Sequence, residues 1–286
     1  MTEGHENGSP LQARPAGRPV RKDEIVLADR GLYIESWLPE RRSRRRPLYL
    51  LHGELGGSWV WERFLLYFAQ RGWEGHALNL RGHFWSEVAD LATTGFEDYV
   101  EDAIAGYDAL GRPGVIVGHG MGALLALRVA EEREALGLVL LSPALPAAIR
   151  PQPPAHVVRL VPATFKRELL GWGGAVDQIR RQNPDLSLRD VTRVQHLMGE
   201  GAGPARRAML EGVAVDRERV AGVPGLVIGA GLDRLFPEPE SEKLAEWLGA
   251  PYEPFGAHSH YGLVIGEESH LQVADAIRTY LDQHRL

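Results

Sequence analysis

The segment over residues 114–132 constrains the fold more than any other part of the chain. It opens with a β-branched run from Val115 to Val117. It then places three glycines in the five positions 118–122 and continues as an apolar helical pattern. A run that is apolar throughout is typical of a strand buried on both faces, so the segment predicts a strand, a sharp turn and a helix. The middle of the turn is Gly120, which has no side chain.

The same alternation of strand and helix extends along most of the chain. Such alternation favours an α/β fold, with a mostly parallel central sheet and helices on both of its faces. The alternation stops after Pro143 and resumes at Gly225. Strands are expected at 24–28, 31–38, 48–51, 75–80, 115–117, 136–142, 225–229 and 252–255, and further helices at 58–71, 97–110, 238–248 and 267–282.

Residues 144–220 contain helix-like segments separated by glycine-rich joints, and no convincing strand. We interpret this stretch as a helical cap inserted into a sheet domain made of residues 23–143 and 221–286. Residues 1–22 are rich in glycine, proline and charge, which predicts a disordered tail. The helix-like segments of the cap are Phe165–Leu170, Ala175–Gln182, Leu188–Met198 and Pro204–Glu211.

Composition excludes several classes of function. The net charge of -6 gives no overall electrostatic attraction to nucleic acid. The basic run RRSRRRP at 41–47 is interpreted as a solvated loop, because no aromatic residues interleave it and no second basic cluster supports it. The chain has no cysteine, which excludes disulfides and thiolate metal sites.

The sequence also argues against a membrane span and against a bound metal. No apolar run reaches the ~18 to 20 residues that a span needs, and the N-terminus lacks the apolar stretch of a secretory signal, so we expect a cytoplasmic protein. His258 and His260 have a spacing at which two side chains can chelate an ion. No further ligand cluster accompanies them, so no metal is expected and no cofactor is implied.

Several short motifs occur in an order that marks a known superfamily. They are LYLLHGELGG at 48–57, LNLRGHFWSE at 78–87, VGHGMGA at 117–123, GAGLDRLFP at 229–237 and GAHSHYGLVIGEE at 256–268. Together with the inserted cap, this order resembles the α/β-hydrolase superfamily, in an esterase- or lipase-like form. The resemblance covers nearly all of residues 24–286. It implies the α/β-hydrolase fold and a small-molecule ester or acyl substrate.

The resemblance places Gly120 at the centre of the nucleophile elbow, where the family has Ser, Asp or Cys. Gly118 and Gly122 match the small residues that this turn needs two positions to either side. Glycine cannot attack a carbonyl, so no acyl-enzyme can form at position 120. Glycine also relieves a backbone strain of about 1–3 kcal/mol. By the same resemblance, the amides of Met121 and Glu54 are expected to donate to an oxyanion.

An acid and a histidine complete the expected site. Asp233 stands where the family has its triad acid, and His260 or His258 is the site histidine. We prefer His260, because an aromatic residue directly follows it, as in the family. His119 borders the substrate-binding region, and both His119 and His52 are interpreted as structural.

Glu54 is unusual for the oxyanion turn. One interpretation is that its carboxylate points to solvent and only its amide matters. The other makes it a second acid or base opposite His260. A carboxylate at this place opposes the negative charge of an oxyanion unless it is protonated, which counts against ordinary ester hydrolysis.

Three hypotheses for the function follow. The first is a hydrolase-like enzyme in which an Asp233–His260 dyad activates water without a covalent intermediate. The second is a non-catalytic binding or scaffold protein on a hydrolase fold. The third is a serine hydrolase whose nucleophile at position 120 was removed by engineering. The sequence leaves the substrate and the oligomeric state open.

Overall fold

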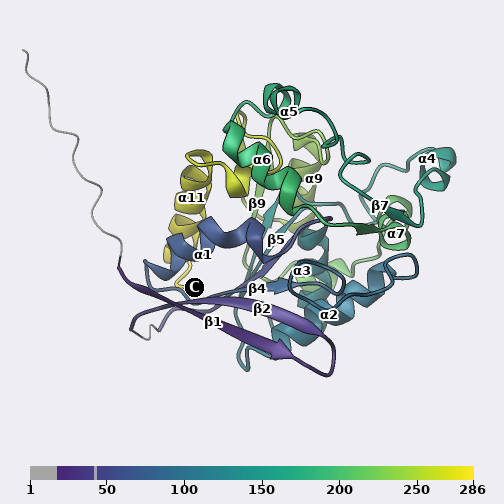
Figure 1. Ribbon diagram of the computed structural model, residues 1–286. Helices are drawn as coiled ribbons and strands as arrows, with labels where there is room; N and C mark the ends of the chain where they lie inside the picture. The colour runs from purple at the N-terminus through teal and green to yellow at the C-terminus, as the bar shows by residue number, and fades with distance from the viewer. Residues whose placement is uncertain (1–17, 42–43) are drawn as a thin grey trace, which may run out of the picture.

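The computed structural model describes residues 18–41 and 44–286, and these residues contain a mostly parallel sheet of eight strands (Figure 1). The strand order is β1-β2-β4-β3-β5-β6-β9-β10. Strand β2 runs antiparallel to both β1 and β4, and all other neighbours are parallel. The strands are β1 (Val20–Leu27), β2 (Leu32–Pro39), β3 (Leu48–Leu51), β4 (Gly75–Asn79), β5 (Val115–His119), β6 (Gly137–Leu141), β9 (Gly225–Ala230) and β10 (Tyr252–Phe255).

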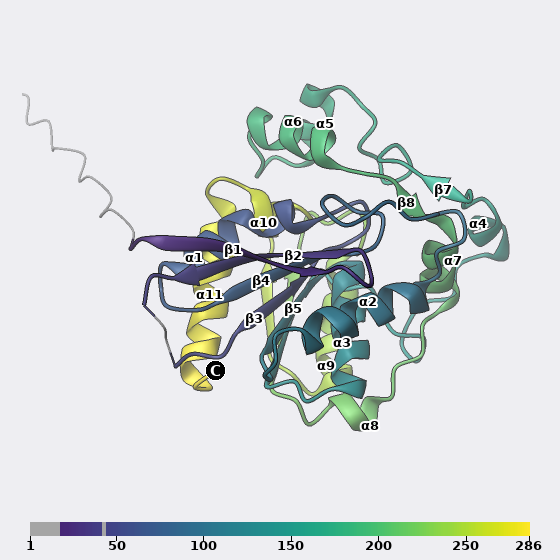
Figure 2. The same ribbon diagram turned by 60° about the horizontal axis from the view of Figure 1, so that its bottom comes forward.

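Helices cover both faces of this sheet, as the alternating sequence predicted. Helices α1 (Glu62–Ala69) and α11 (Ser269–Gln283) lie on one face. Helices α2 (Phe96–Asp108), α3 (Met121–Glu132) and α9 (Glu238–Leu248) lie on the other, and Figure 2 shows the two layers well separated. Along β3, alternate residues enter the two opposite cores, which explains why this strand is apolar throughout.

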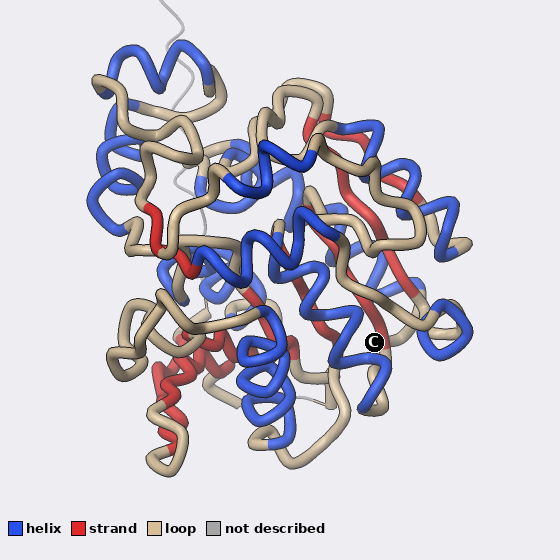
Figure 3. Tube along the Cα trace, turned by 90° about the vertical axis from the view of Figure 1, so that its right-hand side faces the viewer, coloured by secondary structure: helices blue, strands red, loops and turns tan. Residues whose placement is uncertain are grey.

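The segment between β6 and β9, here called the inserted segment (residues 144–220), is mainly helical. One expectation is wrong: residues 165–170 form no helix, and two short antiparallel strands join the helices instead. The ring of Phe165 covers Gly201 so closely that a Cβ there would lie 2.3 Å from it, which favours the strand pair. Figure 3 shows this pair apart from the main sheet. The elements are α4 (Ala155–Arg159), β7 (Thr164–Phe165), α5 (Val176–Gln182), α6 (Leu188–Leu197), β8 (Gly201–Ala202), α7 (Gly203–Glu211) and α8 (Arg217–Val220).

The inserted segment is tied to loops at the carboxyl edge of the sheet. The amide of Gly199 donates to the carbonyl of Leu55, just after β3, at 3.1 Å. Near β10, the carboxylate of Asp185 accepts from the amide of Ser259 at 2.8 Å. The inserted segment therefore lies over the edge where the expected site residues follow their strands.

The N-terminal boundary of the sheet domain differs from the expectation. Most of the expected disordered tail (1–22) lies outside the described residues, but β1 already begins at Val20. Val20 pairs in register with Pro39, and because this backbone pairing needs no apolar side chain, no residue pattern before position 24 indicates it. Residues 42–43 of the basic run also lie outside the described part. Arg45 of that run is ion-paired with Asp282 of α11 at 2.6 Å, so this part is anchored to the core domain.

No helix within the described residues combines the length and the apolarity that crossing a membrane requires.

Candidate active site

The turn between β5 and α3 brings backbone segments into close contact. Gly120 has φ 58° and ψ -117°, a left-handed φ that favours glycine. A Cβ on Gly118 would lie 2.3 Å from the carbonyl oxygen of Gly122, and one on Gly122 would lie 2.1 Å from that of Leu51. The two flanking glycines are therefore required by contact between backbone atoms. This is the physical basis of the spacing seen in the sequence.

His260 and Asp233 form a buried pair. Nδ1–H of His260 donates to Oδ2 of Asp233 at 2.7 Å. The other carboxylate oxygen of Asp233 accepts from the amides of Leu235 at 2.7 Å and Phe236 at 2.9 Å. These bonds hold the carboxylate as an acceptor, and the carboxylate in turn holds the proton on Nδ1. Nε2 of His260 is then left as the basic nitrogen of the ring.

The alternative histidine lies elsewhere. His258 donates through Nε2 to the carbonyl of Ser269 at 3.3 Å, and its ring packs against Phe255. The structure therefore brings His260, and not His258, to Asp233.

Gly120 faces the same histidine. A Cβ built on Gly120 would lie 3.3 Å from Nε2 of His260 and 3.2 Å from the ring of Phe236. Gly120 follows β5, Asp233 follows β9 and His260 follows β10, so three parallel strands deliver these positions to one edge of the sheet. A side chain with an oxygen at position 120 would meet the basic nitrogen of the dyad.

His119 and His52 are buried next to the site and bond to the backbone around it. His119 donates through Nε2 to the carbonyl of His260 at 3.0 Å, and the two rings lie 4.0 Å apart between centroids. Burial lowers the pKa of His119 well below its usual value, and it lowers the pKa of His52 to about 3. His52 bonds to the backbone of Gly53 and Leu80. Both rings are neutral at neutral pH and fix backbone positions around the dyad.

Two backbone amides border this site. Met121 is the first residue of α3, and Glu54 follows β3. Within the part of the chain that the structure describes, neither amide has a hydrogen-bond acceptor. Glu54 and Met121 line one small space, and a free amide at a helix N-terminus can receive a developing negative charge.

The carboxylate of Glu54 does not point to solvent, which corrects one of the two interpretations. It is buried, and its Oε2 accepts from Nη1 of Arg206 in α7 at 2.7 Å. Its Oε1 is buried and has no hydrogen-bond partner among the described residues. The sequence could not reveal this ion pair, because the two residues are 152 positions apart.

Sequence reasoning also missed Phe236, whose ring lies 5.5 Å from that of His260. Phe236 and the pair of Glu54 and Arg206 line a pocket of about 80 Å³ between the inserted segment and the sheet domain. The only local signal was the position of Phe236 three residues after Asp233. A second space of about 10 Å³ lies beside Met121 and Tyr99.

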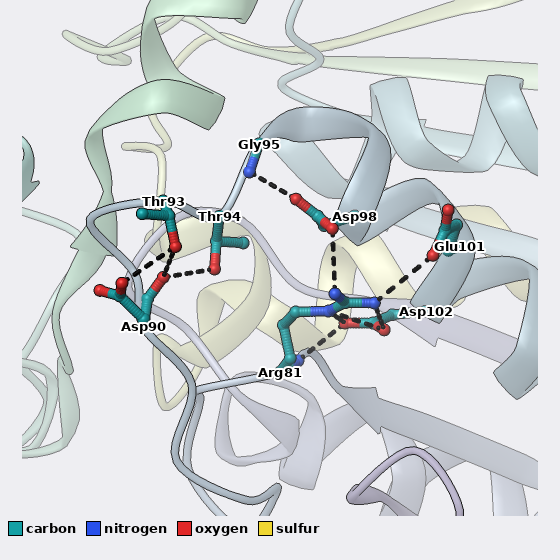
Figure 4. A network of polar contacts seen from close by, with 8 residues as sticks. All are labelled: Arg81, Asp90, Thr93, Thr94, Gly95, Asp98, Glu101 and Asp102. Atoms are coloured by element: carbon teal, nitrogen blue, oxygen red, sulfur yellow. Dashed lines mark hydrogen bonds and ion pairs between the residues drawn. The ribbon is translucent and has the colours of Figure 1, made fainter.

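The turn after β4 is held by a charged network, which Figure 4 shows from close by. The carboxylate of Asp102 in α2 accepts from the backbone amide of Arg81 at 2.9 Å and from its guanidinium at 2.7 Å. Arg81 also pairs with Asp98 at 3.0 Å. The network fixes the turn that places the ring of His83 5.2 Å from that of His52.

Comparisons with solved structures show the same fold. An esterase from Thermogutta terrifontis, in a malate-bound structure, is 19% identical and has a TM-score of 0.69, with 93% of this chain and 100% of that chain covered. A monoacylglycerol lipase from Paleococcus ferrophilus is 20% identical, with a TM-score of 0.67 and coverage of 88% and 99%. A hydrolase from Pseudomonas aeruginosa is 19% identical, with a TM-score of 0.67 and coverage of 91% and 98%.

A search of curated proteins found no match. The family model described as "Serine aminopeptidase, S33" matches residues 42–253, which is most of the chain. The matched residues include the turn around Gly120 and Asp233, and His260 lies after them. The chain belongs to the serine aminopeptidase family of α/β-hydrolases.

Proposed function

We propose that this protein is a hydrolase-like enzyme that acts on a small, partly apolar ester or related acyl compound without a covalent intermediate. The observation that carries the proposal is the dyad: His260 is bonded to Asp233 at 2.7 Å, and its Nε2 lies 3.3 Å from where a Cβ on Gly120 would stand. This arrangement can remove a proton from water but offers no nucleophile of its own at position 120.

The reaction follows from these positions. Nε2 of His260 takes a proton from water as the water oxygen bonds to the acyl carbon, and Asp233 stabilises the resulting imidazolium. The carbonyl oxygen becomes negative and is bound by the amides of Met121 and Glu54. The bond to the leaving alcohol then breaks, and His260 returns the proton to that alcohol. The products are a carboxylic acid and an alcohol.

The ion pair between Glu54 and Arg206 removes one objection to this chemistry. A lone carboxylate beside an oxyanion would raise the energy of the transition state. Arg206 holds the carboxylate at 2.7 Å, so the local charge of the pair is close to zero. The pair also makes Glu54 a poor second base, because its carboxylate is stabilised in the charged form by Arg206.

The pocket supports a small substrate. Its volume of about 80 Å³ and its wall of Phe236, Leu235 and Met209 suit a short acyl group. The inserted segment acts as the cap of this pocket in our proposal, because Arg206 and Met209 of α7 form one of its sides.

A second candidate is a binding protein without turnover. The glycine at position 120 favours it, because this residue relieves the strain of the turn and gives up the nucleophile. The pocket and the two free amides would then hold a carbonyl or a carboxylate. Removal of a serine by engineering would produce the same residue, and Gly120→Ser tests both cases.

The test is hydrolysis of 4-nitrophenyl acetate by the protein, by His260→Ala and by His258→Ala. We expect the protein to exceed the buffer rate and His260→Ala to fall by at least tenfold, since general-base catalysis contributes about 10²–10⁴-fold. His258→Ala is the matched control from the same loop and should keep its rate. An unchanged rate in His260→Ala contradicts the mechanism, and a protein no faster than buffer favours the binding protein.

A further inference from the structure

The pocket beside the dyad contains an arginine that the proposed reaction does not use. Arg150 lies shortly after β6, at the start of the inserted segment, and lines the pocket together with Phe236. The ring of Phe236, which lines the pocket, lies 5.5 Å from the ring of His260, so the pocket lies next to the dyad. One ligand can therefore place one group at Arg150 and another at His260.

The two guanidinium groups of the pocket differ in their partners. Arg206 is ion-paired with Glu54. Arg150 donates through Nε to the carbonyl of Leu210 at 3.2 Å, and within residues 18–41 and 44–286 it forms no ion pair with a carboxylate. Its Nη1 and Nη2 thus remain available.

The positive charge of Arg150 is half-buried, and among the described residues no carboxylate forms an ion pair with it. Burial is the largest influence on Arg150 and lowers its pKa, and the positive charge of Arg206 acts in the same direction, whereas Glu240 and Glu54 raise it. A half-buried cation without an ion-pair partner, on the wall of a pocket, is stabilised by any anion that enters.

Glu240 of α9 lines the same pocket without pairing to Arg150. Burial raises the pKa of Glu240, which shows that its environment disfavours the charged form. An anion on Arg150 would be repelled by Glu240, so Glu240 limits the affinity of the pocket for anions. Arg150 and Glu240 should therefore affect binding in opposite directions.

We propose that this pocket is a subsite for a carboxylate group of the ligand, held by Nη1 and Nη2 of Arg150. A guanidinium offers two parallel N–H groups that match the two oxygens of a carboxylate. The apolar wall of Leu235 and Met209 suits a short alkyl chain between that carboxylate and the acyl carbon. This inference rests on the proposed function for the place of the acyl carbon, and it names the substrate class: short acyl compounds that carry a second, acidic group.

Calorimetric titration with succinate tests the inference without any turnover. We expect succinate to bind and its neutral analogue dimethyl succinate to bind at least tenfold more weakly. Arg150→Gln should weaken succinate binding at least tenfold, and Glu240→Gln should strengthen it several-fold. Arg159→Gln, at an exposed position of α4, is the matched control and should bind as the unchanged protein does.

Several results overturn the inference. They are equal affinity for succinate and dimethyl succinate, no detectable succinate binding at millimolar concentration, or unchanged affinity in Arg150→Gln. Binding of inorganic phosphate in place of succinate also overturns it, because the anion would then not be a carboxylate. If Arg150→Gln does not fold, Arg150→Lys keeps the charge without the paired N–H groups and should bind more weakly than the unchanged protein. Loss of hydrolysis in His260→Ala is measured separately, so the two proposals can fail independently.

Discussion

Gly120 is the residue on which the chemistry of this site depends. Its φ of 58° is the conformation in which a nucleophile elbow presents a side chain, and the space above it faces Nε2 of His260. A serine there would have an oxygen within reach of the dyad. The same backbone therefore serves a covalent hydrolase or a noncovalent site, and one side chain decides between them.

Replacing Gly120 tests this directly. We expect Gly120→Ser to react stoichiometrically with a fluorophosphonate and Gly120→Ala to remain unlabelled, as read by intact-protein mass spectrometry. Both variants should lower the free energy of unfolding by about 1–3 kcal/mol in urea, because a Cβ at positive φ is strained. An unlabelled but folded Gly120→Ser would contradict the view that the dyad is able to activate a nucleophile.

His76 makes stability depend on pH. Burial lowers its pKa to about 4, below its unfolded value near 6.5. Between these values the unfolded chain binds a proton on this residue that the folded protein does not, so the contribution of His76 to the free energy of unfolding falls by about 3 kcal/mol as the pH drops from about 6.5 to about 4. The buried His52 and His119 act in the same direction, so His76→Gln should make the curve less steep in this window, as measured by urea unfolding at several pH values. The exposed variant His156→Gln should keep the original curve, and an equally steep curve in His76→Gln would refute the assignment.

At the scale of elements, helix α2 is positioned by its charged contacts with the turn after β4. Asp102 is fully buried and accepts from both the backbone and the side chain of Arg81 (Figure 4). Because Asp102 belongs to α2 and binds Arg81, it fixes the turn after β4 relative to this helix. The turn places the ring of His83 against the ring of His52. The network therefore helps to hold the backbone around the candidate site.

We expect Asp102→Asn to lower the free energy of unfolding by about 3 kcal/mol, because Arg81 then loses its closest counter-charge in a buried setting. The control is Glu101→Gln, which removes an exposed carboxylate 3.8 Å from the same guanidinium and should change stability by no more than about 0.5 kcal/mol. Chemical unfolding monitored by tryptophan fluorescence measures both. Similar losses of unfolding free energy in the two variants would mean that the burial of Asp102 does not add to the stability of the protein.

At the scale of the whole molecule, an ion pair beside the candidate site joins the inserted segment to the sheet domain. Glu54 belongs to the loop after β3, and Arg206 belongs to α7. The pair is mostly buried, so each partner depends on the other for compensation of its charge. Glu54 also carries one of the two amides at the site. A shift of α7 would therefore change the charge that these amides face.

A double-mutant cycle measures this link. Arg206→Gln leaves Glu54 buried without its partner and should lower the free energy of unfolding by about 3 kcal/mol. Glu54→Gln combined with Arg206→Gln should recover part of that loss, with a coupling energy of about 1–3 kcal/mol from the four unfolding curves. Additive losses would show that the pair does not hold the inserted segment to the sheet domain.

The sequence by itself determined the order of strands and helices in the sheet domain and the positions of the elbow glycines. These features depend on neighbours along the chain. Apolar runs and helical periodicity reveal burial locally, and Gly118 and Gly122 are fixed by contacts within a single turn and with β3. The four-residue loop between β1 and β2 was also visible as a turn at Asp29 to Gly31, although the pairing that extends β1 to Val20 was not.

Only the tertiary structure decided which polar groups meet. It selected His260 over His258 as the partner of Asp233, because the chain after β10 turns one ring toward the acid and the other toward Ser269. It paired Arg206 with Glu54, and among the described residues it gave Arg150 no carboxylate partner. Such contacts join residues far apart in sequence, and their geometry is set by how strands and helices pack, for which no local pattern of residues carries a signal.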